Sequence, residues 1–112
     1  MKPAGLFNES LDQLSQNKEV TSRIGEPIHG YGVGHDYGDL GEGSRNYFEH
    51  VHLKDKDGNL RLRIKYNIEG PSGHAFVFAE VNHNMKKGEY VYLILQFTKS
   101  GEIVKIIDNR KL

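Results

Sequence analysis

The chain has 112 residues, of which 37% are hydrophobic and 27% charged; this is typical of one globular domain with a modest core and too apolar for a disordered chain. The 15 basic and 15 acidic residues balance, so the net charge does not indicate a nucleic-acid binder and we expect no nucleic-acid partner. Cysteine is absent, which excludes disulfides, thiolate metal sites and thiol catalysis.

The N-terminal segment has a helical pattern. Phe7, Leu11 and Leu14 are spaced by four and three residues, which predicts that they form one face of a helix. A second short helix is predicted over Lys18–Ile24, and Gly25 is suited to end it because glycine readily takes the left-handed conformation. We therefore expect one or two helices at the start of the chain.

A glycine-rich run, GYGVGHDYGDLGEG, follows over residues 30–43. A phosphate-binding loop needs a strand before it and a helix after it, whereas this run lies between predicted helices and predicted strands. The spacing GxGxG also departs from GxGxxG, and the chain contains no Gly-Lys-Ser/Thr triplet. We interpret the run as a connecting loop and expect no nucleotide cofactor.

From Tyr47 onward the hydrophobic period changes to two. In NLRLRIKYNIE, at residues 59–69, apolar and polar residues alternate strictly, and Asp57-Gly58 before it is a strong hairpin signal. Further strands are predicted around residues 46–54, 74–82, 89–97 and 103–107. The sequence thus predicts a single α+β domain over residues 1–112, with the helices packed on a largely antiparallel, about five-stranded sheet. The predicted core consists of Phe7, Leu11, Leu14, Leu62, Ile64, Tyr66, Val77, Val81, Leu93 and Leu95.

A histidine pair leaves a metal site open as an alternative. His50 and His52 alternate along a predicted strand, and His35 with Asp36 in the preceding loop could complete a zinc or iron site and support a metal-dependent enzyme. Because Val51 between them is apolar, we expect the two imidazoles on the exposed face of the strand, where histidines are common. The chain has no G-x-S-x-G motif, so we expect no catalytic residue, no metal and no other cofactor.

The best candidate for function is a row of cations. Arg61, Arg63 and Lys65 fall on one face of the most regular predicted strand, where adjacent like charges repel and no neighbour is obviously placed to neutralise them. A row of this kind suits an acidic peptide, although charged strand faces are also commonly only solvated. The candidate partner-binding residues are Arg61, Arg63, Lys65, Arg45, Lys86 and Lys87.

An ordered series of segments carries a family resemblance. IGEPI, Arg45-Asn46 before an aromatic residue, HVHLKDKDG, RLRIKYNIEG, AFVFAEV, EYVYLILQF and IIDNR follow one another from about Leu11 to Arg110. The series resembles the intermembrane-space domain of the twenty-one-kilodalton subunit of the mitochondrial inner-membrane presequence translocase, the TIM complex. The long, acidic glycine-rich loop departs from the shorter, more basic loop expected in that family.

The resemblance implies a non-enzymatic tether at the mitochondrial inner membrane, with this domain facing the intermembrane space. Its basic surface would bind the acidic intermembrane-space tail of the outer-membrane translocase receptor, which would support protein import and inner-membrane sorting. Other presequence translocase subunits and respiratory-chain complexes are the further implied partners. In the family a presequence and one transmembrane helix precede the domain. Cytochrome oxidase assembly factors of similar fold supply an alternative function.

Overall fold

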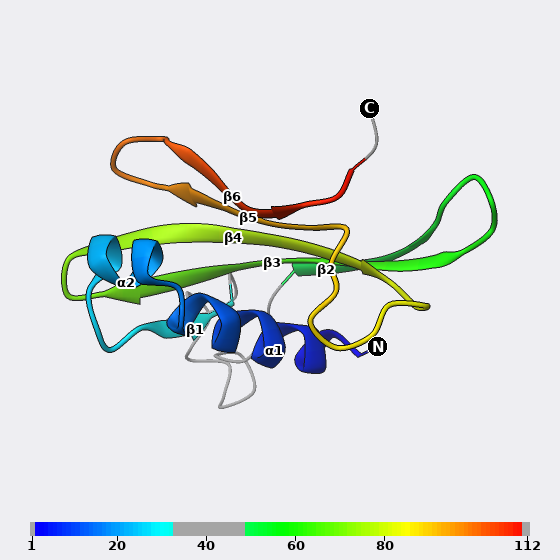
Figure 1. The fold of residues 1–112 in the computed structure, drawn as a ribbon, viewed down its shortest axis with the longest axis horizontal. Coiled ribbons are helices and arrows are strands. Elements are labelled where there is room, and N and C mark those ends of the chain that lie inside the picture. Colours follow the sequence, from blue (N-terminus) through cyan, green and yellow to red (C-terminus); the bar gives the residue numbers. More distant parts are fainter. Residues whose placement is uncertain (1, 33–48, 111–112) are drawn as a thin grey trace, which may run out of the picture.

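The computed structural model describes residues 2–32 and 49–110. Two helices precede an antiparallel sheet with the strand order β1-β3-β4-β5-β6, and β2 also pairs with β3 (Figure 1). This confirms the α+β prediction, with six strands in place of about five. The elements are α1 (Pro3–Ser15), α2 (Lys18–Ile24), β1 (His29–Tyr31), β2 (Glu49–Lys54), β3 (Leu60–Gly70), β4 (Gly73–Asn82), β5 (Tyr92–Phe97) and β6 (Ile103–Asp108).

The additional strand is β1, which includes the first glycine of the glycine-rich run. The prediction that the connecting loop begins at Gly30 was therefore wrong at this point. A Cβ atom on Gly30 would lie 2.9 Å from Leu11 Cδ2 and 3.1 Å from Phe7 Cζ, so glycine allows α1 to approach the strand closely. Residues 33–43 of the run lie outside the described residues.

Both helices lie on the same face of the sheet, which we call the inner face; the opposite one is the outer face (Figure 1). The predicted core residues are all buried except Phe7 and Leu11, which are partly buried and pack against the core. Strand β3 accounts for much of this arrangement, because its alternating apolar side chains point inward under the helices. The alternation predicted from the sequence is confirmed.

Helix α1 is rotated slightly from the predicted orientation. Leu6, Ser10 and Leu14, four residues apart, are its fully buried residues. The Ser10 hydroxyl lies 2.7 Å from the Tyr66 hydroxyl on β3, so a buried polar pair is satisfied within the core. Leu6, which was absent from the predicted core, is fully buried, whereas Phe7 is partly buried and contacts the Tyr66 ring edge-on.

The core assignment can be tested at Leu93. This residue is fully buried on β5, so Leu93→Ala should lower the free energy of unfolding by about 2–5 kcal/mol. Ile103→Ala is the matched control, because Ile103 is 58% exposed on the neighbouring strand. Urea unfolding of both variants makes the measurement, and equal losses at the two sites would show that the inner and outer faces are assigned wrongly.

Candidate functional site

The row of cations projects from the outer face, as predicted. Leu62, Ile64 and Tyr66 are buried on the inner face, so the alternate residues Arg61, Arg63 and Lys65 must point away from it. The side chains of these three cations are 29%, 52% and 39% exposed. The structure therefore brings all three to one surface.

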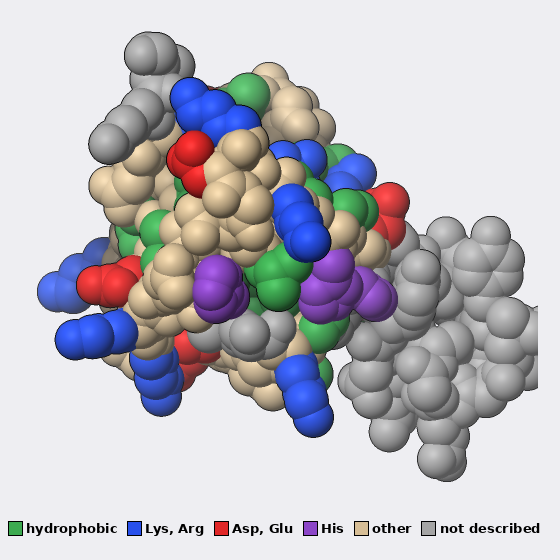
Figure 2. Space-filling model, turned by 90° about the vertical axis from the view of Figure 1, so that its right-hand side faces the viewer, with side chains coloured by type: hydrophobic (Ala, Val, Ile, Leu, Met, Phe, Trp, Pro, Cys, Tyr) green, Lys and Arg blue, Asp and Glu red, His purple; other side chains and the backbone are tan. Residues whose placement is uncertain are grey.

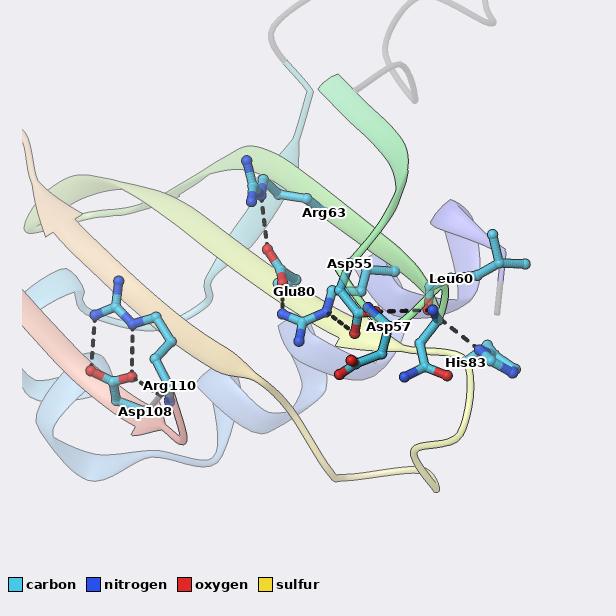
Figure 3. Close-up of polar contacts among 10 residues, drawn as sticks. Asp55, Asp57, Leu60, Arg63, Glu80, His83, Asp108 and Arg110 are labelled. Atoms are coloured by element: carbon cyan, nitrogen blue, oxygen red, sulfur yellow. Dashed lines mark hydrogen bonds and ion pairs between the residues drawn. The ribbon is translucent and has the colours of Figure 1, made fainter. Parts of the chain in front are cut away.

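Glu80 on β4 joins two of these cations. Arg61 Nη1 donates a hydrogen bond to Glu80 Oε2 at 2.8 Å, and Arg63 Nε donates to Glu80 Oε1 at 2.9 Å (Figure 3). Hydrogen bonding to the Glu80 carboxylate raises the pKa of both guanidinium groups. Only 3% of the Glu80 side chain is exposed. The expectation that the cations lack a neutralising neighbour was wrong, because one carboxylate bridges two of them.

The hairpin between β2 and β3 holds Arg61 a second time. Arg61 Nε lies 3.4 Å from Asp55 Oδ2, while Asp55 Oδ1 accepts hydrogen bonds from the backbone N–H groups of Asn59 and Asp57. The hydrogen bond from the Asn59 N–H contributes most to lowering the pKa of Asp55, and the Asp57 N–H and the charge of Arg61 add to it. The Asp55 carboxylate therefore stays ionised. Arg61 is therefore committed to contacts inside the domain, and Arg63 and Lys65 are better placed to meet a partner.

Lys65 lies beside aromatic rings rather than in a close ion pair. Its Nζ is 4.0 Å from Glu49 Oε2, a long contact between two exposed groups. The same Nζ lies 4.9 Å from the centre of the Phe76 ring and 5.6 Å from that of Phe78, both within the range of a cation–π interaction. The outer face thus combines positive charge with half-buried aromatic surface.

A second charged group lies at the β6 end of the outer face. The Arg110 guanidinium donates two hydrogen bonds to the Asp108 carboxylate, at 2.8 and 2.9 Å, and it lies over the Tyr92 ring (Figure 3). These bonds lower the pKa of Asp108. Lys105 Nζ is 3.7 Å from the same carboxylate. Asp108 pairs with Tyr92, and Tyr92 with Glu80, so this group and the arginines lie in adjacent parts of one surface.

Two of the other predicted partner-binding cations, Lys86 and Lys87, do not join this surface. Lys86 and Lys87 are exposed in the loop between β4 and β5, where Lys87 lines a shallow hollow together with Glu9 and Asp12 of α1. They therefore lie on the helix side of the domain. Arg45 lies outside the described residues.

The histidine pair is exposed, as predicted, but it lies on the inner side of the sheet and not on the side of the cations. His52 pairs with Leu62 and Val51 pairs with Arg63, so the imidazoles share the face of the core while Val51 lies on the outer face and is 53% exposed. The pair is nevertheless exposed, because β2 joins the sheet at an edge where residues 2–32 place no helix over it. Figure 2 shows this end of the molecule, where histidine side chains flank a hydrophobic patch.

His52 lines a shallow cavity, but the histidine pair gains no further metal ligand from the described residues. His52, Leu60 and His83 border a hollow of about 230 Å³ at the end of the sheet. In residues 2–32 and 49–110 no group of three His, Cys, Asp or Glu side chains is arranged to hold a metal ion. His35 and Asp36, the other candidate ligands, lie outside these ranges.

Within the same ranges, no helix is both long and apolar enough to cross a membrane.

Comparison with known proteins identifies the family. A protein-family model described as TIM21 matches residues 2–110. The mitochondrial import inner membrane translocase subunit Tim21 of Bos taurus is 30% identical over 112 residues, which cover 96% of this chain and 43% of the relative. The chain belongs to the TIM21 family. The Tim21 protein of Rattus norvegicus is also 30% identical, over 114 residues, with the same coverage.

A solved structure supports the fold independently. The intermembrane-space domain of the mitochondrial import protein Tim21 from S. cerevisiae matches with a TM-score of 0.74, covering 96% of this chain and 94% of that one. The sequence identity is 16%, so this match speaks for the fold alone. Membership of the TIM21 family places the chain at the mitochondrial inner membrane, where its relatives are import translocase subunits.

Three contributors to the outer face of this TIM21 domain were not predicted from the sequence: Glu80, Phe76 and Phe78. Their place on the outer face follows from the sequence pattern, since these residues alternate with the inward-facing apolar residues of β4. The two-residue turn at Pro71-Ser72 then sets Arg63 opposite Glu80. The position of this turn and the alternation along β4 together predict that Glu80 lies beside Arg63 on the outer face.

The Glu80 bridge predicts a measurable loss of stability. Glu80→Gln keeps the size of the side chain but removes its charge, so two charge-assisted hydrogen bonds are weakened and we expect a loss of about 1–3 kcal/mol in unfolding free energy. Glu102→Gln is the matched control: Glu102 also accepts from an arginine, Arg23, but its side chain is 52% exposed. The control should leave urea unfolding almost unchanged. Equal effects of the two substitutions would contradict a structural role for the bridge.

Proposed function

We propose that this domain is a non-enzymatic tether that binds the acidic intermembrane-space tail of the outer-membrane translocase receptor through its outer face. It thereby links the inner- and outer-membrane translocases and supports protein import and inner-membrane sorting. Membership of the TIM21 family supports the pathway. The observation that carries the proposal is the position of Arg63 and Lys65, which project from a sheet face that α1 and α2 leave uncovered.

The electrostatics of this face favour an anionic partner. Glu80 and Asp55 together balance the charges of Arg61 and Arg63, so the attraction to an anion rests on the exposed part of the Arg63 guanidinium and on Lys65. Arg63 donates to Glu80 through Nε and lies beside the Tyr92 hydroxyl, and its remaining N–H donors can bind a second carboxylate. Lys65 adds a neighbouring ammonium group two residues along the same strand. An acidic extended segment lying near Arg63 and Lys65 would therefore gain favourable charge contacts.

The chain spans less than half the length of the curated relatives that it matches. In the full-length protein we infer a presequence and one transmembrane helix before this domain. Such an anchor would hold the domain close to the membrane surface and within reach of a receptor tail. Other inner-membrane translocase subunits and respiratory-chain complexes are the further partners that we infer for the full-length protein.

Charge reversal tests the proposed surface. Arg63→Glu with Lys65→Glu replaces attraction by repulsion, so affinity for a synthetic peptide of the receptor's acidic tail should fall at least about tenfold, mainly through slower association. The matched control is Lys86→Glu with Lys87→Glu, which makes the same change of charge on the helix side. Fluorescence anisotropy at 0.1 M and 1 M salt makes the measurement, with circular dichroism to confirm folding.

Two outcomes would contradict the proposal. Equal losses in the outer-face variant and the control would show that only net charge matters. Unchanged affinity in the outer-face variant would place the site elsewhere.

Purification of the tagged full-length protein from solubilised mitochondria distinguishes the tether from an oxidase assembly factor. A tether should co-purify with outer-membrane translocase subunits, and the outer-face variant should lose them.

A further inference from the structure

Four outer-face residues form a straight row across the strands. Lys65 on β3 pairs with Phe78 on β4, Phe78 pairs with Ile94 on β5, and Ile94 pairs with Lys105 on β6. Residues directly opposite one another in an antiparallel sheet share a face, so all four project from the outer face. We call them the transverse row. It has an apolar centre and a lysine at each end.

The centre of the row offers apolar surface beside the charges. Phe78 is half-buried, whereas Ile94 is buried with 9% of its surface exposed, so the apolar surface at the centre is mainly that of Phe78. Phe76, two residues from Phe78 on the same strand, extends this surface, and Lys65 Nζ lies close to both rings. A purely electrostatic site would have no use for this aromatic centre. A partner side chain that covers it would remove apolar area from water and add a component of binding that does not weaken with salt.

The two lysines are paired only loosely inside the domain. Lys65 Nζ is 4.0 Å from Glu49 and Lys105 Nζ is 3.7 Å from Asp108, and the two lysine side chains are 39% and 58% exposed. Ion pairs of this length between exposed groups contribute little to stability. A carboxylate of a bound peptide can therefore replace or join either acidic neighbour at small cost.

The spacing of the row fits an extended peptide. Three inter-strand distances of about 4.8 Å separate β3 from β6, so the backbones of Lys65 and Lys105 lie about 14 Å apart. In an extended chain residues i and i+4 are about 13 Å apart, and i, i+2 and i+4 point to the same side. In a helix the same two residues are only about 6 Å apart and would reach one lysine.

We propose that the transverse row recognises an extended peptide segment with acidic residues at positions i and i+4 and an apolar residue at i+2. The two carboxylates meet Lys65 and Lys105, and the apolar side chain covers the exposed part of the Phe78 ring, next to Ile94. The segment crosses the strands instead of adding to the sheet edge. This inference rests on the proposed function, because it specifies which part of an acidic tail the outer face selects.

Three labelled synthetic peptides test the selection against the intact 112-residue chain. The first contains Asp-Ser-Leu-Ser-Asp within a neutral flanking sequence, the second has the same composition ordered Asp-Asp-Leu-Ser-Ser, and the third replaces the leucine of the first by serine. Fluorescence anisotropy at 0.15 M salt should show the first binding at least about fivefold more tightly than either of the others. At 1 M salt the difference between the first and the third should persist, because it comes from apolar contact.

A substitution at the β6 end completes the test. Lys105→Glu should remove the advantage of the first peptide over the second, whereas Lys99→Glu, an exposed lysine in the β5–β6 turn, should preserve it. Equal affinity for all three peptides, with binding still lost on Arg63→Glu and Lys65→Glu, overturns the inference and leaves the tether proposal standing. Failure of every acidic peptide, the full receptor tail included, overturns both.

Discussion

The packing of α1 and α2 on one face of the sheet imposes the division on which the rest of this domain depends. With α1 and α2 on the inner face, the strands beneath them must place apolar side chains on that side, and β3 achieves this by strict alternation. The same alternation delivers Arg61, Arg63 and Lys65 to the outer face. A shift of the register by one residue would bury the cations and expose the core at once, so the packing energy of the core fixes the geometry of the candidate binding surface.

The outer face is not a simple basic patch. Glu80 removes much of the repulsion between the two arginines and holds both guanidinium groups in place, at the cost of reducing the positive charge available to a partner. The remaining attraction is concentrated on Arg63 and Lys65, beside the rings of Phe76 and Phe78. Such an arrangement favours a partner whose charged and apolar side chains follow a matching pattern. Negative charge alone would select a partner less well, because salt at physiological concentration screens the attraction between exposed charges.

Features set by local periodicity could be predicted from the sequence, namely the two helices, the β2–β3 hairpin and the inward face of β3. Features set by tertiary contacts could not. Strand β1 has three residues and contains Gly30, so no strand propensity marks it, and the close packing of α1 is what explains the glycine. The side of the sheet on which His50 and His52 lie could not be predicted because β2 is exposed on both sides, which removes the hydrophobic signal. Lys86 and Lys87 were grouped with the row by charge, although only the path of the β4–β5 loop determines their side of the domain.

Methyl NMR of the isoleucine-labelled domain tests the central claim most directly, because isoleucines mark both faces. Ile94 lies on the outer face, whereas Ile64 and Ile68 are fully buried on the inner face. On titration with a peptide of the receptor's acidic tail, the account predicts a saturable shift of the Ile94 methyl signal, with those of Ile64 and Ile68 almost unmoved. Saturable shifts confined to Ile64, Ile68 or Ile24 of α2, with Ile94 unchanged, would contradict binding at the outer face.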